Sequence, residues 1–254
     1  MKFIFSEEMV QVMKTEIIYE DADLLVCRKP AGFPTQTAAL GKDDMVNELK
    51  RYLADKAEDH KEPYLGVVHR LDQPVEGLLA FAKNKKAAAR LTEDLKKGIF
   101  NKNYYAVSYN QPFIEQGVLE DYLVRDKKTS TAKIATANTP GAQKAVMHYR
   151  VVAVSDKCVL YSIHIETGRF HQIRVQMAHA GMPLLGDQKY GDAAGMEFSK
   201  QMKIKNVALC AFEIALTQPT TGERLAFTIQ PVGEAFRMFF QNDQGVKAGK
   251  DEQK

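Results

Sequence analysis

The chain has 254 residues, 45% of them hydrophobic and 26% charged, and carries a formal net charge of +3. Its apolar residues are numerous enough to fill a core, which excludes an intrinsically disordered chain, and the small basic excess permits a polyanionic partner without demanding one. The sequence contains neither the run of about 20 apolar residues that crosses a bilayer nor a recognisable signal peptide, so we predict no membrane contact.

The first predicted elements are a β-hairpin and an amphipathic helix. Residues 17–19 and 24–28 have strand-forming side chains on either side of an acidic turn. Residues 45–53 carry apolar side chains at i, i+4, i+7 and i+8, which predicts a helix. Asp43 or Asp44 is suited to cap its first turn.

A polar insert follows between two apolar runs. Residues 65–68 and 78–82 are predicted strands, so the charged side chains of residues 69–77 are expected at a strand end. Asn84 is expected to cap the next helix, which Gly98 ends by adopting a left-handed backbone.

Strand patterns dominate the middle of the chain and predict a large sheet. A helix is expected over residues 171–180, facing the core with Ile173, Met177 and Ala180, and another is expected to begin after Pro231. The predicted strands cover residues 103–109, 119–124, 132–137, 147–154, 159–165, 208–216 and 225–229.

No internal repeat, long linker or break in composition divides the chain. We therefore predict a single domain over residues 17–241, preceded by an extension of residues 1–16. Residues 242–254 are polar and lack apolar periodicity, so they are predicted to form a disordered tail.

The cysteines and histidines indicate neither a disulfide nor a metal site. Cys27, Cys158 and Cys210 are widely spaced and form no Cys-x-x-Cys pair, which favours a reducing cytoplasm. His171 and His179 are eight positions apart rather than four and have no second ligand pair, so no metal is expected.

Two segments carry side chains suited to chemistry. Arg70 and Asp72 place a cation and a carboxylate two positions apart at a strand end, although such a pair alone is more typical of a solvated turn than of a site. Residues 167–175 follow a strand and open a helix, where free backbone N–H groups favour a phosphate. His171 and Arg174 share a face of that helix, which fits either a site or an ordinary solvated face.

A basic cluster begins at the helix that Asn84 caps. Seven cations stand there against Glu93 and Asp94, so the cluster fits either a phosphate backbone or a solvated helix face. The cations are Lys83, Lys85, Lys86, Arg90, Lys96, Lys97 and Lys102.

In this order, the segments resemble the RluA-type family of RNA pseudouridine synthases. The resemblance extends over residues 17–240 and is quite specific. Its parts are Lys-Pro-Ala-Gly at 29–32, His-Arg-Leu-Asp at 69–72, Gly at 77, Ala-Lys at 82–83, Lys-Asn-Tyr-Tyr-Ala at 102–106, Gly-Arg-Phe-His-Gln-Ile-Arg at 168–174, Pro-Leu-Leu-Gly-Asp at 183–187 and Tyr-Gly at 190–191.

The resemblance implies an α+β fold, with a mixed, largely antiparallel sheet, flanking helices and a central catalytic cleft. It implies an enzyme that converts a uridine of ribosomal or transfer RNA to pseudouridine with no metal or organic cofactor. By the same likeness Asp72 is the catalytic aspartate, Arg174 its partner, Tyr104 the ring that packs on the flipped base, and Arg70 the side chain that enters the base stack. Further substrate contacts are assigned to His69, Leu71, Arg169, His171, Gln172 and Ile173, and RNA backbone contacts to Lys83, Lys85, Lys86, Arg90 and Lys102.

Two departures from the family pattern bear on substrate identity rather than on the reaction. Val75 and Glu76 stand where the family commonly has Thr-Ser, and Phe170 stands where it has Thr. Alternatives are a catalytically inactive RNA-binding protein of the same fold and a glycosidic-bond hydrolase with Glu76 as second acid. We expect a monomer without an obligatory protein partner.

Overall fold

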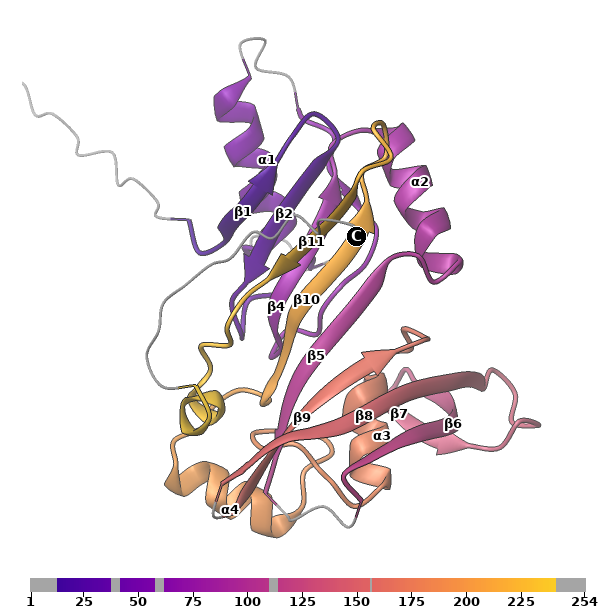
Figure 1. Ribbon diagram of the computed structural model, residues 1–254, viewed down its shortest axis with the longest axis vertical. Helices are drawn as coiled ribbons and strands as arrows, with labels where there is room; N and C mark the ends of the chain where they lie inside the picture. The colour runs from indigo at the N-terminus through magenta and orange to yellow at the C-terminus, as the bar shows by residue number, and fades with distance from the viewer. Residues whose placement is uncertain (1–12, 38–41, 58–61, 110–113, 156, 241–254) are drawn as a thin grey trace, which may run out of the picture.

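The structure is a computed structural model that describes residues 13–37, 42–57, 62–109, 114–155 and 157–240. Its strands form one sheet of 11 strands (Figure 1). They are β1 (Glu16–Glu20), β2 (Leu24–Lys29), β3 (Gly66–Val67), β4 (Glu76–Ala82), β5 (Asn101–Ser108), β6 (Gln116–Asp126), β7 (Thr131–Ala135), β8 (Gln143–Ser155), β9 (Cys158–Ile165), β10 (Leu209–Thr217) and β11 (Arg224–Thr228). The helices are α1 (Met45–Lys56), α2 (Lys85–Lys96), α3 (Gln172–His179) and α4 (Ala193–Gln201), followed by the 3₁₀ helix η1 (Glu234–Met238).

The sheet runs in the order β1-β2-β4-β10-β5-β9-β8-β6-β7, with β3 beside β4 and β11 beside β10. Neighbouring strands are antiparallel except for β4 and β10, which are parallel. This confirms the predicted α+β fold with a mixed, largely antiparallel sheet.

The sheet divides between β4 and β10. These strands pair only where Glu76 and Gly77 meet Cys210 and Ala211, and farther along β3 takes the edge of β4 while β11 takes the edge of β10. A β-carbon on Gly77 would lie 2.4 Å from the Ala211 nitrogen, so only glycine permits this close approach. The loop that carries Asp72 enters the sheet at this division.

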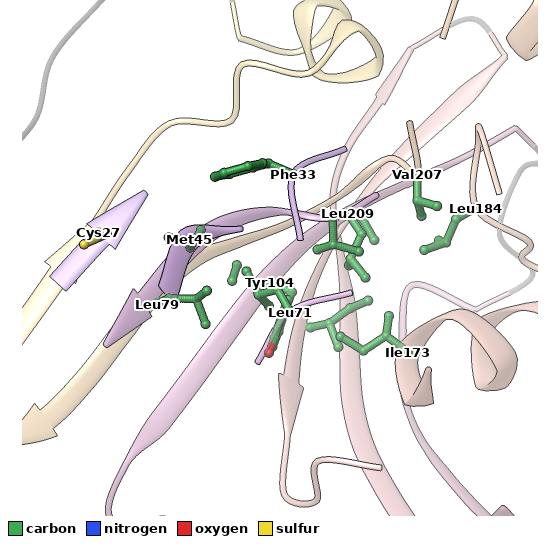
Figure 2. Close-up of a cluster of buried hydrophobic side chains, with 14 of the residues drawn as sticks. Cys27, Phe33, Met45, Leu71, Leu79, Tyr104, Ile173, Leu184, Val207 and Leu209 are labelled. Atoms are coloured by element: carbon green, nitrogen blue, oxygen red, sulfur yellow. The ribbon is translucent and has the colours of Figure 1, made fainter. Parts of the chain in front are cut away.

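Alternate side chains of the strands build two cores, one on each face of the sheet. On the first face Leu79 and Tyr104 pack with α1 and α3 (Figure 2), and on the second Leu78 and Val107 pack with α2 and η1. The side chain of Leu71 lies in the first core. The face that carries α1 and α3 therefore also carries the segment around Asp72.

The predicted helix caps are present in α1 and α2. The Asp44 side chain accepts from the Asn47 N–H at 2.8 Å, and the Asn84 side chain accepts from the Ala87 N–H at 2.8 Å. Gly98 adopts the left-handed backbone expected of it, with φ at 69°.

Three expectations about the last helices were wrong or incomplete. α3 is buried on nearly all sides, because it packs under the β6–β7 hairpin as well as on the sheet, and Ala180 is exposed rather than in the core. α4 was not predicted, and the helix after Pro231 is a short 3₁₀ turn.

The predicted extension and tail lie mostly outside the described residues, and the domain limits stay a prediction. In the described part, the backbone N–H groups of Lys14 and Thr15 donate to the Glu48 carboxylate at 2.7 and 3.0 Å. Among the described residues, no helix is long and apolar enough to span a membrane.

Candidate active site

Asp72 lies in the loop between β3 and β4, where the sheet divides. Its side chain is 25% exposed, so solvent reaches part of it. The Val75 N–H donates to the Asp72 carbonyl at 3.0 Å, which turns the chain back into β4. On the other side, Thr35 Oγ1 donates to the carbonyl of buried Leu71 at 3.1 Å. The carboxylate therefore stands on a loop that is fixed on both sides.

Lys29 ties this loop to the end of β2. Its buried ammonium donates to the carbonyls of Pro30, Gln73 and Val75 at 2.9, 2.9 and 2.6 Å. Burial lowers the pKa of Lys29 to about 7, and the negative charge of Asp72 opposes that shift. The bonds to Gln73 and Val75 hold the part of the Asp72 loop that leads into β4.

Arg174, on α3, bridges Asp72 and a second carboxylate, Asp187. Its Nη1 donates to Asp72 Oδ2 at 3.1 Å, while Nε and Nη2 donate to the two oxygens of Asp187 at 2.7 Å each. Arg174 is 3% exposed and Asp187 fully buried. Burial opposes the charge on Arg174, but its hydrogen bonds to Asp187 and the charges of both carboxylates outweigh burial and raise its pKa. The expected Arg174–Asp72 pair is present, and a bidentate grip by Asp187 orients it.

His171 lies near the same Asp72 oxygen that Arg174 contacts. Its backbone is left-handed, with φ at 54°, and its Nε2 lies 3.6 Å from Asp72 Oδ2. Burial lowers the pKa of His171 to about 4, against the effect of Asp72, so the ring is neutral at pH 7. Nδ1 lies 2.8 Å from the Tyr190 hydroxyl. A hydroxyl that donates to Nδ1 leaves the proton on Nε2, directed towards the carboxylate.

Tyr104, on β5, lies on the same face of the sheet as the Asp72 loop. Its ring belongs to the buried cluster that contains Leu71 and Ile173 (Figure 2). Burial raises the pKa of the Tyr104 phenol, and the charge of Asp72 raises it further. The phenol is therefore protonated and presents an aromatic ring near the carboxylate.

The remaining predicted substrate contacts divide into exposed and internally bonded groups. Arg70 is exposed beside Asp72, whereas Leu71 and Ile173 are core side chains. Arg169 Nε donates to the exposed Lys144 carbonyl of β8 at 2.9 Å. The Gln172 amide donates to the Val146 carbonyl at 3.1 Å and accepts from Thr167 and the Arg169 N–H, and these bonds are internal to the fold.

The geometry does not favour the predicted substrate contact of His69. The Ala80 N–H donates to its Nε2 at 3.0 Å, and its ring packs edge-on against Phe100 at 4.9 Å. Burial lowers the pKa of His69 to about 3. The His69 side chain lies where β4 and β10 separate. Its Nε2 accepts the Ala80 N–H of β4, a bond that a neighbouring strand would otherwise supply.

Glu76 does not share a cleft with Asp72. Along β4 it alternates with Gly77, so its side chain lies on the second face of the sheet, with Leu78. There it accepts from the N–H groups of Val232 and Gly233 at 3.3 and 2.9 Å, and burial raises its pKa. The site that contains Asp72 therefore gains no second acid from Glu76.

The structure separates the basic cluster. Lys83 pairs with Glu20 at 2.8 Å and Arg90 with Asp94 at 3.2 Å, while α2, which carries Lys85 and Lys86, packs on the second face. Lys102 lies on the face of Tyr104, where burial lowers its pKa. Of the cations predicted to contact the RNA backbone, Lys102 therefore lies on the face of Tyr104, whereas those of α2 belong to the helix on the opposite face.

Sequence reasoning did not single out Lys29, Asp187 or Tyr190 as functional. Each lies in a segment that carried the family resemblance, and this was the feature of the sequence that could have identified them as functional. Their importance follows from contacts between distant segments, such as the one from Tyr190 to His171, and spacing alone does not reveal those.

The arrangement offers a partly exposed carboxylate, one oxygen of which lies near both a fixed guanidinium and a neutral imidazole. A charged carboxylate held in this way can stabilise positive charge or act as a nucleophile. In the described part of the chain, no cluster of three or more His, Cys, Asp and Glu side chains has the geometry to hold a metal ion.

Comparison with known proteins agrees with this chemistry. The model of the RNA pseudouridylate synthase family matches residues 23–179. The uncharacterized RNA pseudouridine synthase YlyB of Bacillus subtilis is 33% identical over 220 residues, which cover 86% of this chain and 70% of that protein. Ribosomal large subunit pseudouridine synthase C of Rickettsia conorii is 32% identical, covering 84% of this chain and 69% of its own length.

A further relative and a solved structure complete the comparison. Ribosomal large subunit pseudouridine synthase D of Vibrio parahaemolyticus is 33% identical, covering 85% of this chain and 67% of its own length. The structure of human RNA pseudouridylate synthase domain containing 4 superposes with a TM-score of 0.70 at 24% identity, covering 88% of this chain and 92% of the human one. That structure shows the fold alone.

Proposed function

Because the chain belongs to the RluA-type family of RNA pseudouridine synthases, we propose that Asp72 is the catalytic carboxylate with which it isomerises a uridine of ribosomal or transfer RNA. The enzyme is an isomerase that acts on RNA. Two of the relatives are named for the ribosomal large subunit, which makes ribosomal RNA our first candidate and transfer RNA the second.

The reaction requires one ionised carboxylate at the reacting sugar. The bond from ribose C1′ to uracil N1 breaks, the uracil turns, C1′ bonds to carbon 5, and carbon 5 then loses its proton. As in glycoside hydrolysis, a carboxylate beside C1′ can stabilise positive charge or add covalently, and it can alternatively remove a sugar proton. Since the base is retained, no second acid is required.

The bridge from Arg174 to Asp72 and Asp187 is the observation that carries this proposal. A carboxylate in a partly dry cleft tends to become protonated, and a nearby guanidinium opposes that tendency. Asp187 holds Arg174 by two hydrogen bonds of 2.7 Å, so the third donor meets Asp72 without a search through rotamers.

Arg70 and Tyr104 are suited to hold an everted uridine. Swinging a stacked base out of RNA costs a few kcal/mol, which a side chain in the vacated stack and an aromatic face for the base can offset. Exposed Arg70 adjoins Asp72, and the Tyr104 ring lies on the same face. We expect Arg70→Ala to reduce productive eversion more than RNA affinity.

The alternatives have less support. A hydrolase would need a second acid, and Glu76 is bonded to Val232 and Gly233 on the opposite face. An inactive RNA-binding protein would have no need for an oriented Arg174–Asp72 pair.

The test is to map pseudouridines in cellular RNA with and without the gene. We expect one or a few uridines to lose modification, and the intact enzyme, but not Asp72→Asn, to restore them. An unchanged map in cells without the gene would contradict the proposed substrate classes, and release of free uracil by the purified protein would indicate hydrolysis.

We also propose that the enzyme is a cytoplasmic monomer in which residues 17–241 form one catalytic domain. The bacterial relatives named for the ribosomal large subunit support the location. Light scattering at micromolar concentration tests the oligomeric state, and a mass of twice the chain would contradict it.

A further inference from the structure

The β6–β7 hairpin packs against the helix that carries Arg174. Tyr122–Asp126 of β6 pair with Thr131–Ala135 of β7, and this hairpin lies beside α3 (Figure 1). Leu123 and Ala132 share a buried cluster with Val175 of α3. The hairpin is therefore a separate small core beside the active site, joined to α3.

One link between hairpin and site is a stack of three side chains. The Arg125 guanidinium lies 4.2 Å above the Phe170 ring, and the other partner of that ring is His171, stacked at 3.8 Å and 20°. A cation over an aromatic face contributes about 0.5 to 1 kcal/mol at an exposed site. Phe170 is one of the two departures from the family pattern, so this link is a property of this chain.

A second, independent link runs through Tyr190. Its hydroxyl oxygen accepts from the Ala132 N–H of β7 at 2.6 Å, and the same hydroxyl lies 2.8 Å from His171 Nδ1. Because a backbone N–H can only donate, the hydroxyl proton is free to bond Nδ1. This arrangement leaves the imidazole proton on Nε2.

Both links end on His171, whose Nε2 lies 3.6 Å from Asp72 Oδ2. The backbone of His171 is left-handed, a conformation that costs free energy in a residue other than glycine. The hairpin turn beyond the links carries the exposed cations Lys127 and Lys128, which are suited to RNA phosphates.

We propose that the β6–β7 hairpin is coupled to Asp72 through His171, with Phe170 and Tyr190 as positioning residues, so that RNA held against the hairpin fixes the catalytic carboxylate. The coupling rests on the proposed function, because it has a purpose only if Asp72 acts on RNA. It goes beyond that function by placing the control of active-site geometry in a segment that carries neither Asp72 nor Arg174.

The first test measures tritium release from RNA labelled at uridine C5, with total RNA from cells that lack the gene as substrate. Phe170→Thr and Arg125→Gln should each lower kcat by about two- to fivefold, the factor that corresponds to the free energy of the cation–π contact, and the double variant should lose no more than either alone. Phe170→Tyr and Arg125→Lys, which keep the ring and the cation, should retain most activity. Phe198→Thr is the matched control, since its half-buried ring packs on Tyr109 instead.

The second test observes the tautomer of His171 by ¹⁵N NMR of the free enzyme, and so does not depend on the substrate. The wild-type ring should carry its proton on Nε2, and Tyr190→Phe should give a mixture of tautomers together with a lower kcat. An unchanged tautomer in Tyr190→Phe, or additive losses in the Arg125 and Phe170 variants, would overturn the coupling. Failure of the wild-type enzyme to release tritium would instead overturn the proposed function.

Discussion

At the scale of single residues, the guanidinium of Arg174 satisfies two carboxylates at once. Asp187 is fully buried and is paired with Arg174, so its charge depends on that partner. The sequence indicated a cation for Asp72 but gave no reason for a second carboxylate, because Asp187 lies 13 positions beyond Arg174 and meets it only in the fold.

Arg174→Lys should lower kcat on the order of a hundredfold, because an ammonium cannot grip Asp187 by two parallel bonds and still reach Asp72 in the required place. Its free energy of unfolding should fall much less than that of Arg174→Met, which leaves Asp187 without a cation. Tritium release and urea unfolding measure the two effects. Near-normal turnover by Arg174→Lys would show that a point charge is sufficient.

His69 should make the enzyme sensitive to acid. Its pKa of about 3 in the folded state is below the ordinary value of 6.5, so between these pH values the unfolded chain binds more protons. The free energy of unfolding should therefore decrease as pH falls from 6.5 towards 3, by at most about 1.4 kcal/mol per pH unit from this group. In His69→Gln, whose amide oxygen can still accept from Ala80, this part of the slope should vanish. Parallel curves for the two proteins would contradict the assignment.

At the scale of elements, the parts that a local pattern determines were predictable. α1 and α2 have a polar outer face and a capping side chain, and the strands alternate, so spacing located them. α3 differs because the hairpin covers its outer side, and Gln172, Arg174 and Gln176 are buried through bonds to distant partners. α4 is short and lacks the strong apolar periodicity of α1 and α2, so its sequence gave no signal.

The short pairing of β4 with β10 depends on Gly77. With φ at 131°, a β-carbon there would meet the Ala211 backbone at 2.4 Å, so Gly77→Ala should cost at least about 3 kcal/mol of stability and displace the Asp72 loop. Gly98→Ala is the matched control, since its φ is also positive, at 69°, but no atom within 4 Å obstructs a side chain. It should cost about 1 to 2 kcal/mol from backbone strain alone. Equal losses in urea unfolding would argue against a steric requirement at the division.

At the scale of the whole molecule, the two faces of the sheet have different roles, because one carries the candidate active site and the other carries supporting structure. Asp72, Arg174 and Tyr104 gather on the face covered by α1 and α3, whereas Glu76 and α2 belong to the other face. The sequence predicted the strands that make both faces. The sequence did not show that Glu76 and the lysines of α2 belong to the second face. That assignment depends on the order of the strands in the sheet, which local spacing does not reveal.

RNA binding should reveal the two faces through its dependence on salt. Each lost phosphate contact lowers the slope of log K against log salt by about 0.7 to 0.9. The double variant with Arg70→Gln and Lys102→Gln, both on the face of Asp72, should flatten that slope by the amount expected for the loss of about one to two phosphate contacts. Lys85→Gln with Lys86→Gln removes the same charge from α2 and should flatten it less. Filter binding from 50 to 200 mM salt makes the comparison, and an equal effect of both pairs would place RNA on α2 as well.

The most direct test of the whole account is single-turnover tritium release by purified Asp72→Asn. The substitution keeps the shape of the side chain and removes the charge that Arg174 stabilises, so we expect no detectable release although RNA binding and the unfolding midpoint stay near those of the intact enzyme. Release within about tenfold of the intact enzyme, a difference of only about 1.4 kcal/mol in activation free energy, would contradict the claim that an ionised Asp72 performs the reaction.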